Sequence, residues 1–217
     1  MFLGEMTMHF THGTWSRWIV TVIAAAATAL AFMAGMRLRD LGLSRDTLAV
    51  GTRWAAVIIV VMVVVIGIGL LIPSVRDLFR NDSYKQLHWA LLSAFVLIPL
   101  QTVIPEELLF RGIITGTLLK RHSARVAIGV QALLFGLWHV VSSTGLASGN
   151  QGIGSVVGGG TAGMLLGILG AVAFTGAAGV VLAWLRWRTG SLLPSLALHW
   201  VANGAGAIAA AIAWQIG

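Results

Sequence analysis

The chain has 217 residues, of which 58% are hydrophobic and only 10% charged, and its mean hydropathy is +0.91. Apolar runs of this kind exclude an ordinary soluble domain, because in lipid only helices and closed barrels satisfy their own backbone. The absence of cysteine excludes disulfides and a thiol nucleophile, and the net charge of +7 is spread over the ends of apolar segments, so we expect no nucleic-acid partner.

The apolar segments are continuous rather than alternating, which favours helices over a barrel. We therefore predict an all-α, polytopic transmembrane bundle of about seven helices. In chain order the predicted helices are 15–36, 54–72, 88–103, 105–119, 126–141, 161–184 and 191–214.

Two further features describe the domain organisation. Residues 142–160 are rich in Gly, Ser and Asn and predict a flexible loop. Residues 1–85 carry no motif and form an N-terminal transmembrane hairpin region, so we expect residues 86–217 to form the functional core.

Two adjacent carboxylates and an arginine interrupt the apolar sequence in the stretch Ile104-Pro-Glu-Glu-Leu-Leu-Phe-Arg111. Ionisable groups at membrane depth are costly and usually face a cavity or a partner. Pro105 suits the first turn of a helix. Glu107 and Arg111 are four residues apart, so they share a face and can pair, whereas Glu106 points elsewhere and is free for chemistry. The alternative is a plain ion pair near a helix start.

Two histidines stand out within the later apolar segments. Phe135 lies one helical turn before His139, and Asn203 lies one turn after His199, so each pair shares a helix face. A lone buried histidine is more often a packing residue. Three helices that each carry an acid, an imidazole or an amide instead indicate a polar site between them, because a charged group facing lipid costs about 2.5–3.5 kcal/mol.

Three motifs occur in order on three predicted helices: Glu106-Glu107-xxx-Arg111, Phe135-xxx-His139 and His199-xxx-Asn203. This ordered set resembles the CPBP family of CAAX-processing and bacteriocin-processing intramembrane proteases, also called Abi-like or CAAX prenyl protease 2-like. The resemblance covers about residues 87 to 210. Each motif alone is weak evidence, whereas the ordered set is specific.

The resemblance implies a role for each motif residue. Glu106 would be the catalytic carboxylate that activates water for peptide hydrolysis, and His139 would hold and orient that water. His199 and Asn203 would stabilise the oxyanion of the tetrahedral intermediate. Three further residues would support the site: Glu107, Arg111 and Phe135.

The same side chains leave a metal mechanism open. Glu106, His139 and His199 make a two-histidine, one-carboxylate set that is compatible with catalytic zinc. Against zinc, the chain has no H-E-x-x-H sequence, and Asn203 suits an oxyanion donor better than a zinc ligand. We favour a glutamate-activated water without a cofactor, and zinc is the alternative.

Basic residues at the segment ends predict an orientation in the membrane. With 105–119 as a separate span, the basic residues at 76–85, 120–125 and 186–188 share one side, and those at 37–53 face the other. The richer side should be cytoplasmic, which places the site nearer the extracytoplasmic face. We expect a multi-pass protein of the bacterial cytoplasmic (inner) membrane.

The preferred function is an intramembrane endopeptidase that acts on a membrane-associated protein or peptide in the lipid bilayer. Its substrate would be a CAAX-like tail, a peptide precursor or a C-terminal sorting tail, and the sequence predicts no oligomeric state. One alternative is a non-proteolytic bacteriocin-immunity or scaffold protein of the same fold. Another is a transporter or proton relay, although the paired repeats typical of transporters are not found.

Overall fold

The computed structural model describes residues 18–140, 143 and 158–216, and every regular element among them is helical. This confirms the prediction of an all-helical fold. The predicted loop at 142–160 lies almost entirely outside the described residues.

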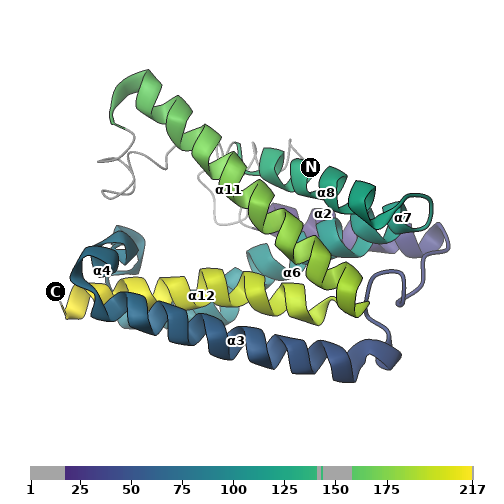
Figure 1. Ribbon diagram of the computed structural model, residues 1–217, viewed down its shortest axis with the longest axis horizontal. Coiled ribbons are helices and arrows are strands. Elements are labelled where there is room, and N and C mark those ends of the chain that lie inside the picture. Colours follow the sequence, from purple (N-terminus) through teal and green to yellow (C-terminus); the bar gives the residue numbers. More distant parts are fainter. Residues whose placement is uncertain (1–17, 141–142, 144–157, 217) are drawn as a thin grey trace.

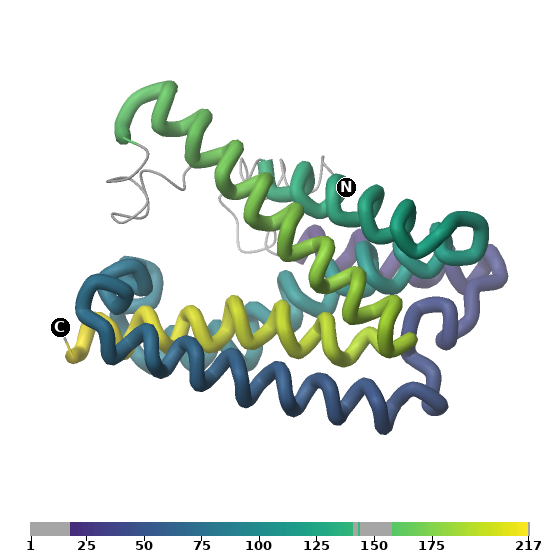
Figure 2. Tube along the Cα trace, in the orientation of Figure 1, coloured from purple at the N-terminus to yellow at the C-terminus, as the bar shows by residue number. Residues whose placement is uncertain are grey.

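The longer helices run along a common direction in Figure 1, and Figure 2 follows the same path as a tube. Their bounds are α2 Ile19–Met33, α3 Leu48–Leu71, the continuous helix Leu87–Leu119, α8 Ala124–Trp138, α11 Gly160–Thr189 and α12 Leu193–Gln215. The short elements are the 3-10 turns Arg45–Thr47 and Asp82–Tyr84 and the helix α4 Pro73–Phe79.

Four helical stretches in the described part of the chain are long and apolar enough to cross a membrane. They are Arg45–Leu71, Leu87–Leu119, Gly160–Thr189 and Leu193–Gln215. The apolar helices α2 and α8 are shorter, at 15 residues each. Exposed side chains along these helices are largely apolar, as expected of surfaces that face lipid.

The helix Leu87–Leu119 corrects the prediction that two helices meet at Pro105. Three short α-helical segments, α5 Leu87–Leu92, α6 Ile104–Glu107 and α7 Thr115–Leu119, are joined by π-helical segments without a break. A proline lacks the N–H that an α-helix needs, and local π geometry is one way in which a helix accommodates this loss. Pro105 therefore lies inside a helix and does not begin one.

This continuity also changes the distribution of charge. Figure 1 shows that the end of α7, the start of α3 and the end of α11 gather at one end of the bundle, on the right. Among the described residues, the basic side chains at this basic end are Arg37, Arg39, Arg45, Arg53, Lys120, Arg121, Arg125, Arg186 and Arg188. Three basic residues lie at the opposite end: Arg76, Arg80 and Lys85. The prediction that these three share a side with Lys120 was wrong, because the single helix separates them.

Two helix pairs frame the molecule. α12 packs along α3 and against the first half of Leu87–Leu119, as far as α6, and α8 packs against α11. The second pair comes very close, because a Cβ on Gly136 would lie 2.8 Å from the backbone oxygen of Val172. α2 covers the helix Leu87–Leu119 around α6, and the buried core there includes Phe110, Phe135 and Trp138. These contacts bring α6, the end of α8 and α12 together.

Candidate active site

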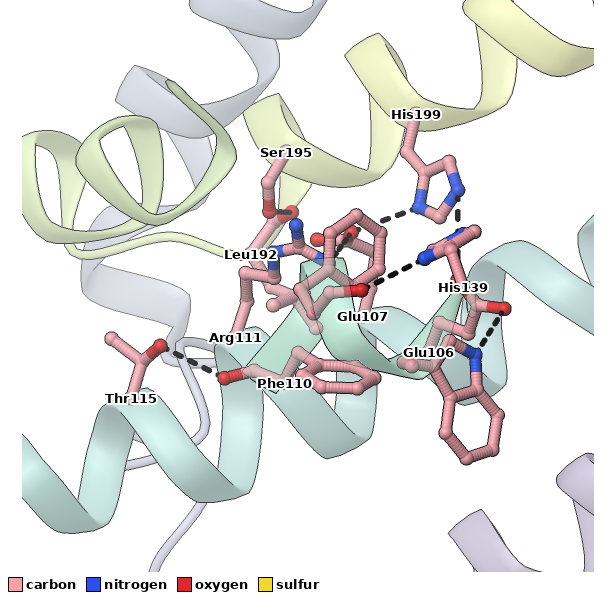
Figure 3. A network of polar contacts seen from close by, with 11 residues as sticks. Glu106, Glu107, Phe110, Arg111, Thr115, His139, Leu192, Ser195 and His199 are labelled. Atoms are coloured by element: carbon pink, nitrogen blue, oxygen red, sulfur yellow. Dashed lines mark hydrogen bonds and ion pairs between the residues drawn. The ribbon is translucent and has the colours of Figure 1, made fainter. Parts of the chain in front are cut away.

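The two glutamates of α6 are both buried, with 5% of Glu106 and none of Glu107 exposed. Figure 3 shows the imidazole of His199, from α12, facing both carboxylates, with His139 from the end of α8 beside them. Three elements that are far apart in the sequence therefore meet, and the structure brings together residues from each of the three motifs, with Asn203 as the exception.

Glu107 is the centre of a buried ionic network. Its Oε1 lies 2.9 Å from Nη1 of Arg111, and neither side chain is exposed. This confirms the pairing predicted from the four-residue spacing. The same oxygen lies 3.0 Å from Nδ1 of His199, which the sequence did not predict. Because a buried charge is stable only when it is paired and hydrogen-bonded, Glu107 and Arg111 depend on each other.

Glu106 has a different set of neighbours. The indole N–H of Trp138 donates to its Oε1 at 3.1 Å. Its Oε2 lies 3.8 Å from Nε2 of His199 and accepts no hydrogen bond from any described residue. One oxygen of this carboxylate is thus held by the protein, and the other is directed towards an imidazole.

The ring of Phe135 contacts Arg111 and both histidines. The guanidinium carbon of Arg111 lies 3.9 Å from the centroid of this ring. The imidazoles of His139 and His199 contact the same ring edge-on, with centroid separations of 4.7 and 5.9 Å. Phe135 therefore gives Arg111 a cation–π contact and fixes the spacing of the two histidines.

His139 caps α8, which ends at Trp138 and not at residue 141 as predicted. Its Nδ1 lies 2.8 Å from the backbone oxygen of Phe135. Because a carbonyl only accepts, Nδ1 carries the proton in this contact, and Nε2 of the neutral ring is an acceptor. The ring is half-buried, so this nitrogen is suited to accept from a water molecule.

The contacts of His199 restrict its protonation states. An ionised Glu107 can only accept, so Nδ1 of His199 carries the proton that joins them. Nε2 then donates towards Glu106 only when the ring is cationic, and accepts when the ring is neutral. The first state suits stabilisation of an anion, and the second suits binding of a water molecule between the ring and Glu106.

Asn203 lies apart from the cluster. It is exposed on α12, one turn beyond His199, and lines an open pocket of about 400 Å³ together with Thr102 and Tyr84. Its side chain hydrogen-bonds to none of the described residues. The structure therefore places the amide beside the carboxylate–imidazole cluster and not inside it.

Trp138 is the contact of Glu106 that the sequence analysis did not assign. Most tryptophans of the chain fall at the ends of apolar segments, whereas Trp138 lies within one, directly before His139. A buried indole N–H usually takes a hydrogen-bond partner. The position of Trp138 within an apolar segment could therefore have indicated that its indole forms a buried hydrogen bond. The partner could not be identified from sequence spacing, because Glu106 is 32 residues away.

A catalytic zinc ion is the alternative that the sequence leaves open. Among the residues that the structure describes, no group of three or more His, Cys, Asp or Glu side chains is arranged to hold a metal ion. One imidazole nitrogen of His199 is already occupied by Glu107, which leaves only Nε2 available to a ligand.

Comparison with known proteins gives one match. A family model described as type II CAAX prenyl endopeptidase Rce1-like matches residues 87–205, which is more than half of the chain. The matched region contains every residue of the three motifs. No curated protein and no solved structure matches the chain.

Proposed function

The chain belongs to the Rce1-like family of type II CAAX prenyl endopeptidases, and on this premise we propose that it hydrolyses peptide bonds through a water molecule activated by Glu106. The family is one of proteases, and the long apolar helices fit an integral membrane protein. The observation that carries the proposal is the buried Glu106, which has one oxygen held by Trp138 and the other unbonded and near His199.

In the proposed reaction, Glu106 transfers one proton from the attacking water to the leaving amine. Oε2 accepts a proton from water as the water oxygen forms a bond to the peptide carbonyl carbon. The carbonyl oxygen becomes an oxyanion. When the tetrahedral intermediate collapses, the C–N bond breaks, and Glu106 returns the proton to the leaving amine nitrogen. The products are a carboxylic acid and an amine, and Glu106 ends as it began.

The other polar groups stabilise this path. A cationic His199 donates through Nε2 to the oxyanion, and Glu107 holds the ring in place through Nδ1. His139 accepts from the attacking water through Nε2. The amide of Asn203, one turn from His199, donates to the carbonyl oxygen of a substrate that enters from the adjacent pocket.

We infer the orientation from the corrected charge distribution. The basic end carries nine of the described basic residues and faces the cytoplasm of a bacterial inner membrane. Glu106 is thirteen residues from Leu119, which is about 20 Å along a helix with a rise of 1.5 Å per residue. In a hydrocarbon core of about 30 Å the site then lies in the outer half. The proposed substrates are CAAX-like tails, peptide precursors and C-terminal sorting tails of exported proteins, and a site in the outer half favours the last two.

The test uses the purified protein in detergent and internally quenched CAAX-type peptides, with and without a prenyl group. Glu106→Gln and Glu106→Ala should lower kcat about 10²–10⁴-fold, the usual contribution of a general base. Asp46→Asn, on the exposed turn Arg45–Thr47, is the matched carboxylate control. Unchanged cleavage in both Glu106 variants would exclude this mechanism, and absence of cleavage in the wild type would favour a scaffold role.

The zinc alternative is tested in the same assay. Addition of 1,10-phenanthroline should leave wild-type cleavage unchanged if Glu106 acts without a metal. Loss of cleavage on chelation, followed by recovery on addition of zinc, would establish the metal mechanism instead.

A further inference from the structure

An open pocket of about 400 Å³ is lined by residues one helical turn from Glu106 and His199, although neither of these two residues lines it. Thr102 lines it from the helix Leu87–Leu119, one turn before Glu106. Asn203 lines it from α12, one turn after His199. Along both helices the direction from the site residue to the pocket residue leads away from the basic end, so the pocket lies between the site and the opposite end of the bundle. Its size is within the usual range of about 300–1,000 Å³ for ligand sites.

The lining of this pocket has no charged residue and combines polar with apolar groups. Its polar residues are Asn81, Tyr84, Thr102 and Asn203, and the others are Leu78, Phe79, Ile98, Ala202, Gly206, Ala207 and Ala210. The side chains of Thr102, Tyr84 and Asn203 line it and hydrogen-bond to none of the described residues. Asn81 also lines it, and its Oδ1 accepts from the backbone N–H of Ser83 at 2.9 Å, which leaves its NH₂ group for another partner. An apolar chain would bury these groups unsatisfied, at a cost of about 1–3 kcal/mol each. A peptide backbone or a neutral polar side chain would satisfy them.

The segment 78–84 supplies part of this lining and precedes the matched region 87–205. It is held against the end of α12. The indole N–H of Trp214 donates to the backbone oxygen of Asn81 at 3.2 Å. Arg80 and Lys85 lie 5.4 and 4.6 Å from the centre of the same indole ring. This pocket wall is therefore fixed by contacts with α12 that lie outside the family motifs.

We propose that this pocket is a substrate subsite that binds an uncharged, polar stretch of peptide next to the scissile bond, and that residues 78–84 determine which peptides are cleaved. The inference rests on the proposed endopeptidase function. The proposal assigns a role in substrate specificity to the end of the N-terminal region. It also places the binding of the peptide in a different part of the protein from the binding of any apolar group of the substrate among the lipid-facing helices.

The kinetic test compares two sets of quenched peptides that differ only beside the scissile bond, with Ser or Asn in one set and Leu in the other. Thr102→Val and Tyr84→Phe each remove one hydroxyl and should lower kcat/KM about tenfold for the polar peptides, mainly through KM. The Leu peptides should be cleaved as by the wild type. Thr175→Val on α11 is the matched control, because its hydroxyl bonds only within its own helix. Equal effects on both peptide sets, or none, would overturn the proposal.

A second measurement does not depend on catalysis. Because the natural chain has no cysteine, Tyr84→Cys in a Glu106→Gln background gives a single thiol in the pocket. A Ser-containing peptide with a bromoacetyl group should label this thiol at least tenfold faster than it labels the thiol of Leu30→Cys, which lies in the largely apolar groove beside α2. An excess of the same peptide without the bromoacetyl group should protect the Tyr84→Cys thiol from labelling. Equal labelling of both positions would overturn the subsite. Selective labelling without wild-type cleavage would retain the subsite and reject the proposed function.

Discussion

His199 donates through Nδ1 to Oε1 of Glu107 across 3.0 Å, and this carboxylate oxygen also pairs with Arg111. The second glutamate of the motif is therefore more than a partner for the arginine. It fixes the imidazole ring so that Nε2 faces Oε2 of Glu106 at 3.8 Å. Adjacent glutamates in one turn of helix thus have separate tasks, since Glu107 orients a histidine and Glu106 keeps one oxygen for chemistry.

Replacement of Glu107 should affect both stability and activity. Glu107→Gln removes the charge that balances Arg111, which is fully buried, so we expect a loss of about 3–5 kcal/mol in the free energy of unfolding. Thermal unfolding in detergent measures this change.

The matched control for that variant replaces both partners. Glu107→Gln with Arg111→Met removes the unpaired cation and should recover a large part of the stability, because an uncompensated buried charge causes most of the loss in the single variant. Cleavage should stay low, because His199 has lost its anionic partner. A double variant that is no more stable than Glu107→Gln would contradict this account of the network.

Trp138→Phe tests the hold on Glu106. The substitution keeps an aromatic ring in the core but removes the N–H that donates to Oε1. We expect kcat to fall about tenfold, in line with a loss of about 1.5 kcal/mol for a hydrogen bond to a charged group. The peptide assay with KM and kcat resolved separately measures this effect.

Trp200→Phe is the control for the loss of an indole hydrogen bond. Its N–H donates to the backbone oxygen of Ala94 at 2.8 Å, away from both glutamates. We expect this variant to lose a similar amount of stability with little change in kcat. If both variants lowered kcat equally, Trp138 would have no special role in orienting Glu106.

Gly116 permits a close approach at the basic end. A Cβ at this position would lie 2.3 Å from the backbone oxygen of Asp40, which also accepts from Arg186 at 2.9 Å. Gly116→Ala should therefore displace the connection between α2 and α3. We expect the free energy of unfolding to fall by about 1–3 kcal/mol, as overpacking commonly causes, and the melting temperature to fall with it. Gly129→Ala has nothing within 4 Å and should be neutral or slightly stabilising. Equal melting temperatures for both variants would argue against this contact.

The carboxylate of Asp40 gives the protein an acid-sensitive contact outside the spans. A hydrogen bond from Lys120 at 2.8 Å, together with the backbone N–H of Arg37, holds its pKa below the ordinary value of 3.8. A lowered pKa in the folded state means that the contribution is present above pH 3.8 and is lost as the pH falls through the folded value.

Melting temperatures from pH 7 to pH 3 measure this contribution. Asp40→Asn should be less stable than the wild type at neutral pH, and the difference should stay constant down to about pH 3.8 and shrink as the pH falls further. Asp46→Asn controls for the removal of one negative charge at the same end. A difference that stayed constant over this range would exclude Asp40 as the titrating group.

The orientation can be measured because the chain has no cysteine of its own. Ser83→Cys and Ser123→Cys place single thiols at exposed positions at opposite ends of the helix Leu87–Leu119. In intact bacterial cells an impermeant maleimide should label Ser83→Cys, and it should label Ser123→Cys only after the membrane is opened. The reverse pattern would place the site in the cytoplasmic half.

Local sequence patterns determined the features that depend on residues close together in the chain. The apolar runs fixed the helical fold, because a backbone in lipid must satisfy its own hydrogen bonds. The four-residue spacing of Glu107 and Arg111 fixed their ion pair, because both lie on one helix face. The ordered motifs also identified the family, whose match spans residues 87–205. The catalytic roles stay predictions for the experiments above.

The tertiary structure decided what depends on contacts between distant segments. Pro105 suggested a helix start, yet flanking π-helical segments carry the helix through it, and this moved the charged loops to opposite ends. The bond from His199 to Glu107 joins residues 92 positions apart. Likewise, only the packing of α12 against the turn Asp82–Tyr84 places Asn203 and Tyr84 in one pocket. Helical periodicity specifies which face a residue occupies, but the neighbour of that face is chosen by the packing of the whole bundle.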